Sequence, residues 1–123
     1  MNMRKIFLLG TVLCLLLLYG CDDIFEKDIT NSITEIITPA DGVTIQGPEI
    51  LIWWNDVVGS DYYELQLVKP NFQSIESLIA DTTLTSGKIT LSIEAGTYEY
   101  RIRACNSAYC TDYSYRSFII SSN

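Results

Sequence analysis

The sequence predicts an all-β fold, a seven-stranded antiparallel β-sandwich that follows a cleaved N-terminal leader. Short segments with alternating apolar and polar residues recur from residue 33 to residue 121, turn residues separate them, and no long helical pattern interrupts them. Period-two alternation is typical of strands with one buried face, and several such strands at short spacing indicate a sandwich. The chain therefore divides into a leader (residues 1–20), a tether (21–32) and one domain (33–123).

The first three expected strands are separated by proline and glycine turns. They cover residues 33–38, 49–54 and 61–68. The first is rich in β-branched side chains and stops at a proline, which is a typical boundary. In the second, the alternation places Trp54 toward the core and its neighbour Trp53 outward. In the third, Tyr63 falls on the buried side and Tyr62 on the exposed side.

The remaining expected strands cover residues 74–84, 88–93, 98–104 and 113–121. The segment that starts at Tyr98 has the clearest alternation in the chain. The segment 74–84 is ambiguous, because its apolar spacing fits an edge strand followed by a loop and also a short helix. We interpret it as the edge strand and keep the helix as the alternative.

Residues 1–20 have the layout of a secretory signal peptide. Arg4 and Lys5 precede an uncharged apolar run over residues 6–19, which is shorter than the roughly 20 residues that a membrane-spanning helix needs. A short membrane anchor is the alternative interpretation. The run ends in Leu18-Tyr19-Gly20-Cys21, which resembles the lipobox of bacterial lipoproteins, although Tyr19 departs from the small or aliphatic residue usual there.

The lipobox resemblance implies cleavage before Cys21 and a covalent lipid on its thiol. Acyl chains there would hold a soluble domain at a membrane surface without a spanning helix. The acidic stretch from Asp22 to Asp28 is similar to the tether of some Gram-negative lipoproteins, which implies an outer-membrane location and, in some lineages, exposure on the outer face. A solvated, disordered linker is the plainer alternative. The expected localisation is the cell envelope, lipid-anchored at the outer membrane, in either leaflet.

The expected mature chain is strongly acidic. Removing residues 1–20 takes away Arg4 and Lys5 but no acid, which leaves 6 basic and 15 acidic side chains and a net charge of −9. Such a surface repels nucleic-acid phosphates and anionic lipid headgroups. The expected partners are therefore the membrane, through the lipid anchor, and an envelope protein or a glycan, but not nucleic acid.

The four cysteines separate into different roles. Cys14 leaves with the leader and Cys21 takes the lipid, so Cys105 and Cys110 remain as an even pair in an exported protein. Four residues separate them, a length that suits a hairpin loop closed by a disulfide. Two reduced thiols in an oxygen-poor niche are the alternative.

Residues 39–120 resemble a fibronectin type III domain. The stretches that carry the resemblance are ILIWWNDVVGSDYYELQL, LSIEAGTYEYRIRACN and YSYRSFII. The resemblance implies a fibronectin type III-like sandwich with Trp54 and Tyr63 in its core. It also implies that Tyr98 occupies the corner position, where the hydroxyl bonds back to nearby backbone. Ala95 stands where the family usually has proline.

The sequence predicts a binding protein rather than an enzyme. The chain contains no histidine, which excludes histidine-based triads and histidine metal sites. Carboxylates are plentiful, but a sandwich of this length has little chain left for a catalytic cleft. We expect no metal and no cofactor apart from the lipid on Cys21.

Four aromatic residues are candidates for ligand contact. Trp53 is expected on an outer sheet face, whereas Tyr62, Tyr109 and Tyr113 lie on or near loops, where such sandwiches often bind. Each also fits an ordinary core or surface role, and the tether or a neighbouring strand could cover Trp53. The leading expectation is a lipoprotein that binds a protein partner or assists envelope assembly. The alternative is a glycan-binding accessory lipoprotein of a polysaccharide-uptake system.

Overall fold

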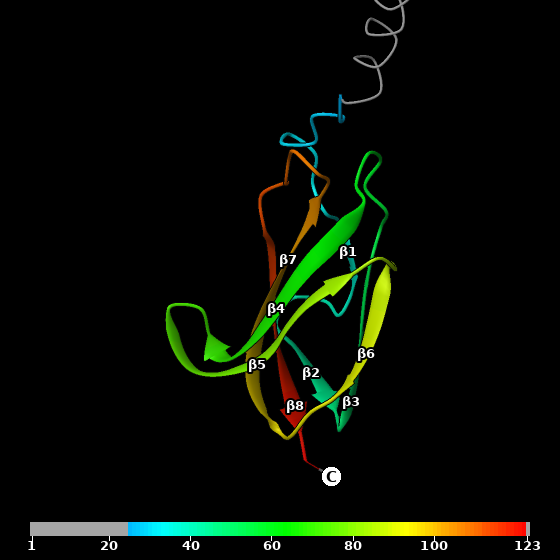
Figure 1. Ribbon diagram of the computed structural model, residues 1–123. Coiled ribbons are helices and arrows are strands. Elements are labelled where there is room, and N and C mark those ends of the chain that lie inside the picture. The colour runs from blue at the N-terminus through cyan, green and yellow to red at the C-terminus, as the bar shows by residue number, and fades with distance from the viewer. Residues whose placement is uncertain (1–24, 123) are drawn as a thin grey trace, which may run out of the picture.

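The computed structural model describes residues 25–122, which form eight strands in two packed sheets (Figure 1). The leader and Cys21 lie outside the described residues. The strands are β1 (Ile36–Thr38), β2 (Val43–Gln46), β3 (Glu49–Trp54), β4 (Tyr62–Asn71), β5 (Ser74–Leu84), β6 (Lys88–Ser92), β7 (Gly96–Cys105) and β8 (Ser114–Ser121). One sheet has the order β1-β3-β6 and the other β2-β8-β7-β4-β5. The predicted all-β, two-layer sandwich is confirmed.

The sequence prediction missed β2, which makes the second sheet mixed. After β1 the chain crosses to that sheet at Asp41-Gly42, where Gly42 has a φ of 75°, a conformation that favours glycine. The Asp41 carboxylate accepts hydrogen bonds from the N–H and hydroxyl of Ser117 on β8 (2.8 and 3.2 Å), and β2 runs parallel to β8. The expected count of seven strands and the purely antiparallel arrangement are wrong, because a four-residue strand beside a turn gives too short an alternation to be recognised.

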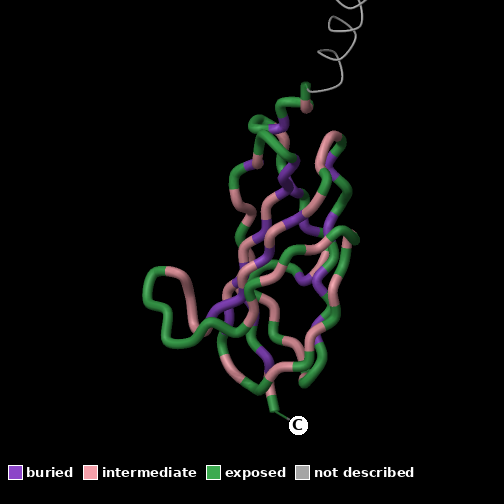
Figure 2. Tube along the Cα trace, in the orientation of Figure 1, coloured by how far each residue is buried: buried purple, intermediate pink, exposed green. Residues whose placement is uncertain are grey.

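The ambiguous segment 74–84 is a strand over its whole length. It forms β5 at the edge of the five-stranded sheet and pairs antiparallel with β4, with two shifts in register. The expected edge strand is therefore confirmed, whereas the expected loop part and the helical alternative are wrong. Its alternation is weak because residues 74–79 are all exposed rather than buried on one face. Figure 2 shows the β4–β5 hairpin standing away from the body of the sandwich.

The core lies between the two sheets, where buried residues alternate along the long strands (Figure 2). Trp54 and Tyr63 pack edge to face with ring centroids 5.4 Å apart, and Tyr98 stacks on Phe118 at the same separation. Trp54, Tyr63 and Tyr98 are each at most 4% exposed. These residues occupy the core positions that the family resemblance implies.

Part of the expected tether packs against the sandwich. Ile29 is completely buried and belongs to the core. It lies against Gly59, whose φ is 91° and where an added Cβ would lie 3.1 Å from the Ile29 side chain. The Ser107 hydroxyl donates to the Glu26 carboxylate at 2.7 Å. Residues 26–29 therefore pack against the same end of the sandwich as the β7–β8 loop (Figure 1).

Two buried tyrosines on β7 have opposite hydrogen-bonding states. The Tyr98 hydroxyl donates to the Glu94 carbonyl at 2.7 Å, as expected for the corner position. The Tyr100 hydroxyl is buried and has no hydrogen-bond partner among residues 25–122. Burial raises the pKa of both phenols, with the nearby Glu94 charge as a further cause at Tyr98.

Replacing each tyrosine with phenylalanine should therefore affect stability differently. Tyr98→Phe loses a hydrogen bond and should lower the free energy of unfolding by about 1 kcal/mol. Tyr100→Phe removes an unsatisfied buried hydroxyl and should leave that free energy unchanged or raise it by up to about 1 kcal/mol. Urea denaturation of the two variants and the wild type measures the difference. Equal destabilisation by both changes would contradict it.

The same two tyrosines predict how the free energy of unfolding depends on pH. A phenol whose pKa is raised in the folded state contributes its full stability below the unfolded-state pKa near 10, and that contribution is lost as the pH rises further. The free energy of unfolding should thus fall above pH 10. Tyr100→Phe removes one of the titrating groups, so it should make this fall with pH less steep by up to about 1.4 kcal/mol per pH unit. Denaturation series at pH 8 to 11.5 test this.

Candidate binding surfaces

Two surfaces of the described chain have the shape and chemistry of binding sites, and the first covers the outer face of the five-stranded sheet. Along β7 the inward residues are Tyr98, Tyr100 and Ile102, so the alternate residues Arg101 and Arg103 point outward. They meet aromatic side chains from β8, from the residues before it, and from the β4–β5 hairpin. We call this the arginine–aromatic face, which comprises Phe72, Arg101, Arg103, Tyr113 and Tyr115.

Arg101 lies at the centre of the arginine–aromatic face. Its guanidinium carbon is 4.5 Å from the centroid of the Phe72 ring and 4.4 Å from that of Tyr113. The Arg101 Nε donates to the Gln66 side chain at 2.8 Å, and one terminal nitrogen contacts the Tyr115 hydroxyl at 3.4 Å. No carboxylate lies within ion-pair distance of Arg101 among the described residues. Neutral partners therefore hold the Arg101 side chain in place, and it forms no ion pair within the described chain.

Arg103 is neutralised, in contrast to its neighbour. It donates two hydrogen bonds to the Glu64 carboxylate, at 2.9 and 2.6 Å, and its guanidinium carbon lies 4.6 Å from the centroid of Tyr113. This ion pair is about one-third exposed, so its value to stability is small. Its effect is to hold Arg103 and Tyr113 in a fixed arrangement beside Arg101.

The β4–β5 hairpin makes this face concave. The Phe72 N–H donates to the Glu99 carboxylate at 2.8 Å, which fixes the hairpin over β7. A cavity of about 750 Å³ lies beneath it, lined among others by Asn71, Phe72, Arg101 and Tyr115. The Phe72 and Tyr115 rings meet edge to face there, with centroids 5.7 Å apart, and amide, carboxylate and guanidinium groups around them supply hydrogen-bond donors and acceptors.

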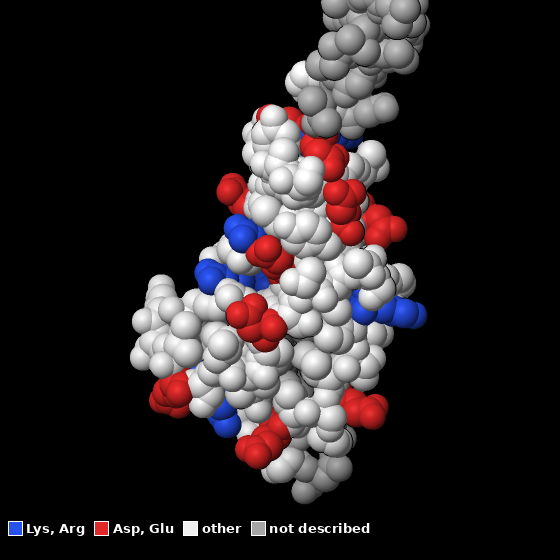
Figure 3. All heavy atoms as spheres, in the orientation of Figure 1, with Lys and Arg blue, Asp and Glu red and all other residues white. Residues whose placement is uncertain are grey.

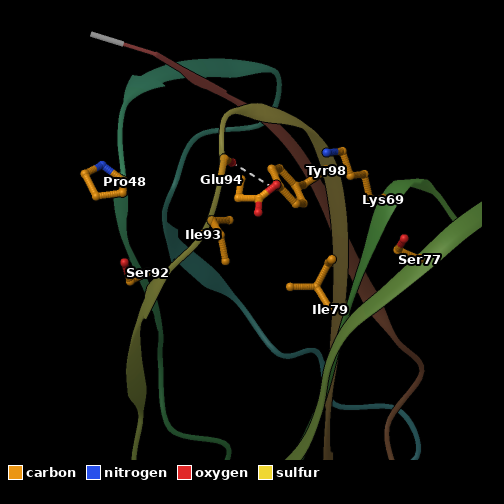
Figure 4. A pocket seen from close by; sticks show the side chains of 8 residues that line it. All are labelled: Pro48, Lys69, Ser77, Ile79, Ser92, Ile93, Glu94 and Tyr98. Carbon is orange, nitrogen blue, oxygen red and sulfur yellow. Dashed lines mark hydrogen bonds between the residues drawn. The ribbon is translucent and has the colours of Figure 1, made fainter.

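The second surface is a cavity of about 510 Å³ between the edges of the two sheets (Figure 4). Ile79 of β5 and Ile93, just after β6, project into it from opposite sides, and the Tyr98 ring lines one end of it beside Glu94 and Lys69. Lys69 lies over the Tyr98 ring, with its ammonium 5.6 Å from the centroid. Glu94 borders the opening with its carboxylate. The cavity thus combines an apolar interior with one charged group of each sign.

The aromatic candidates from the sequence do not form one site. Trp53 is 45% exposed beside Leu51, on the outer face of the three-stranded sheet. Tyr109 is 37% exposed in the loop that the disulfide closes, and Tyr62 is half-buried at the start of β4. Only Tyr113 belongs to the arginine–aromatic face. Sequence reasoning missed Phe72, Arg101, Arg103 and Tyr115 as members of a site, although the alternation along the strand that starts at Tyr98 places Arg101 and Arg103 outward.

Cys105 and Cys110 form a disulfide at the base of the β7–β8 loop. Inside this loop the Asn106 side chain is almost fully buried and makes four hydrogen bonds. Its Oδ1 accepts from the N–H groups of Ala108 and Tyr109 at 3.0 and 2.8 Å, and its Nδ2 donates to the carbonyls of Lys27 and Gly59 at 2.7 and 3.0 Å. Asn106 therefore joins the loop to the N-terminal segment.

The charged and metal-ligating side chains of the described residues limit the chemistry of these surfaces. Acidic side chains are spread over the face in Figure 3, whereas basic ones are confined to a few places. Within residues 25–122 no group of three or more histidine, cysteine or acidic side chains is arranged to hold a metal ion. The same residues contain no helix long and apolar enough to cross a membrane.

The fold is similar to solved structures at low sequence identity. A fibronectin(III)-like module of CbhA from Clostridium thermocellum matches with a TM-score of 0.54 and 9% identity, covering 73% of this chain and 98% of the module. The FN3tt structure matches with a TM-score of 0.52 and 17% identity, covering 73% and 97%. CopC from Methylosinus trichosporium OB3b matches with a TM-score of 0.50 and 11% identity, covering 74% and 96%.

Neither a protein-family model nor a curated protein sequence matches the chain. The structural likenesses establish a fibronectin type III-like β-sandwich, and at these identities they establish the fold alone. Function must therefore be argued from the surfaces of this chain.

Proposed function

We propose that this fibronectin type III-like chain is a non-catalytic lipoprotein of the cell envelope, anchored through Cys21, whose sandwich binds another envelope protein. The observation that carries the binding part is the row of large apolar side chains left exposed along β5, where Ile75, Leu78 and Ile79 are 54%, 59% and 39% exposed. Exposed apolar patches of this kind are typical of partner surfaces. The lipobox resemblance and the acidic tether support the anchor.

The docked N-terminal segment supports a specific orientation at the membrane. Seven residues lie between Cys21 and the buried Ile29, and the eight Cα-to-Cα steps that join them span at most about 28 Å. The end of the sandwich that carries the disulfide and Tyr109 would therefore face the lipid surface. The opposite end and the β5 edge would then face away, toward other envelope components.

The arginine–aromatic face favours a second function, the binding of a glycan. Its concave surface offers the Phe72 and Tyr115 rings for stacking and the side chains of Asn71 and Glu99 for hydroxyl groups. The guanidinium of Arg101, which has no acid partner among the described residues, suits a sugar that carries a carboxylate. This version corresponds to an accessory lipoprotein of a polysaccharide-uptake system.

One comparison of the wild-type chain with Cys21→Ser tests the proposal. In cells fed radiolabelled fatty acid, we expect label and outer-membrane fractionation for the wild type, and neither for Cys21→Ser. Cys14→Ser, which changes a leader cysteine, is the matched control and should be labelled. Crosslinking in the native envelope, followed by mass spectrometry, should join the wild type to one envelope protein. Label retained by Cys21→Ser would overturn the anchor.

A titration of the detergent-purified full chain against an oligosaccharide panel separates the two functions. The glycan function would be favoured if an oligosaccharide binds, Tyr115→Ala weakens this binding about tenfold, or by roughly 1.4 kcal/mol, and Trp53→Ala leaves it intact. Trp53→Ala also tests whether the exposed tryptophan of the other sheet is the stacking residue. If no oligosaccharide of the panel binds and the crosslinking joins the chain to one specific protein, the leading proposal would be favoured.

A further inference from the structure

The outer side of β5 is an unpaired strand edge. β5 is the last strand of its sheet, it has 11 residues, and no other strand of the described chain pairs with its free side. In an antiparallel pair, alternate residues direct their N–H and C=O groups away from the partner. These groups form a row of donors and acceptors along the β5 edge that is available to another extended chain.

The edge has little of the protection that natural sheets usually show. Edge strands are commonly very short or carry lysine or proline. Apart from its two register shifts against β4, β5 has none of these features, and its only charged residues are Glu76 and Asp81. A long edge of this kind pairs readily with a further strand.

The cavity of Figure 4 lies beside the same edge. Its walls include Ser77 and Ile79 of β5, and across from them lie residues that follow β6, the edge strand of the other sheet. A strand added to β5 would thus run along the opening between the two sheets. Its inward side chains would reach the apolar interior formed by Ile79, Ile93 and Tyr98.

We propose that β5 accepts an extended strand from a partner protein, with an apolar side chain of that strand in the cavity and basic side chains opposite the acids of the edge. Backbone hydrogen bonds would supply affinity, and the cavity would supply specificity. This inference rests on the proposed protein-binding function and names the site and the form of the partner.

The charges argue for a basic partner strand rather than a second copy of this chain. Glu76 and Asp81 lie on the edge and Glu94 borders the cavity, whereas Lys69, the basic residue that lines the cavity, lies over the Tyr98 ring. The whole chain carries a net charge of −7. Two copies would bring acids together at this edge, and like charges weaken cross-strand pairing.

Site-specific photocrosslinking in the native envelope tests the inference. A photoreactive phenylalanine analogue is placed in the full chain at Ser77, Ile79 or Asp81, with Trp53 and Thr44 as positions on other surfaces. We expect adducts from the β5 positions that map to successive residues of one segment of one partner protein. Thr44, on the opposite edge of the sheet, should give none.

Two matched substitutions measure the contribution of the edge. Ile79→Asp should lower the yield of the Ser77 adduct about ten- to a hundredfold, the loss expected when one isoleucine can no longer be buried in apolar surroundings. Ile119→Asp is the control, because Ile119 is 41% exposed on β8, away from β5. If circular dichroism shows that Ile79→Asp does not fold, Leu78→Asp, a change at a more exposed position of β5, takes its place in this comparison.

The outcomes distinguish this inference from the proposed function. Adducts that arise only from Trp53 or Thr44 would overturn strand addition and leave protein binding standing. Adducts between isotopically distinct copies of the chain would replace the partner with a second copy and overturn the inference. An equal loss of Ser77 adduct yield for Ile79→Asp and Ile119→Asp would also overturn the inference. No adduct from any position would overturn both.

Discussion

Ile29→Ala should lower the free energy of unfolding by about 2–4 kcal/mol, although Ile29 lies in the acidic segment ahead of the sandwich. The reason is that its side chain is fully buried in the core and lies close to Gly59. Truncating a buried isoleucine removes its transfer free energy and leaves a cavity that the surroundings fill only in part. Urea denaturation followed by tryptophan fluorescence measures the loss, because Trp54 lies in the same core.

The matched control is Ile33→Ala, four residues further along the same segment. Ile33 is 77% exposed, so its truncation should change the free energy of unfolding by no more than about 0.5 kcal/mol. A segment that merely tethers the domain would give the same small effect for both changes. That result would contradict the docking of residues 26–29 and would also remove the argument for a fixed orientation at the membrane.

The layered fold was predictable because alternation along one strand is a local signal. Tyr98, Tyr100 and Ile102 are all buried, as their spacing on β7 indicates. β2 was not predictable in this way, because it has four residues and pairs with β8, a strand about 75 residues further along the sequence. Ile29 escaped prediction for a similar reason, since a single apolar residue among polar ones shows no periodicity.

The candidate surfaces needed information that no single segment contains. Arg101 meets Phe72 and Tyr113 only because β7 lies between β4 and β8 in a particular register. The sequence placed Arg101 on a polar face but did not show which aromatic side chains lay across from it. Likewise, the strand 74–84 was expected at an edge, whereas the cavity beside it depends on where β6 of the other sheet ends.

Asn106→Ala should lower the free energy of unfolding by about 2–4 kcal/mol, more than is usual for a loop residue. The Asn106 amide makes four hydrogen bonds with the backbone of three segments, each worth about 1 kcal/mol. Its removal leaves the carbonyls of Lys27 and Gly59 and two loop N–H groups in need of new partners. Denaturation under non-reducing conditions isolates this effect from the disulfide, whose integrity a thiol assay checks.

Two further variants separate hydrogen bonding from the mere loss of volume. Asn55→Ala changes an exposed asparagine and should have an effect below about 0.5 kcal/mol. Asn106→Asp keeps the shape of the side chain but places a carboxylate oxygen against two carbonyl oxygens, so it should destabilise at neutral pH at least as much as alanine does. A mild effect of Asn106→Asp would mean that packing, not the amide's two donors, joins the disulfide loop to the N-terminal segment. In that case the connection between the N-terminal segment and the sandwich would have to come from the burial of Ile29 and from the Ser107–Glu26 hydrogen bond.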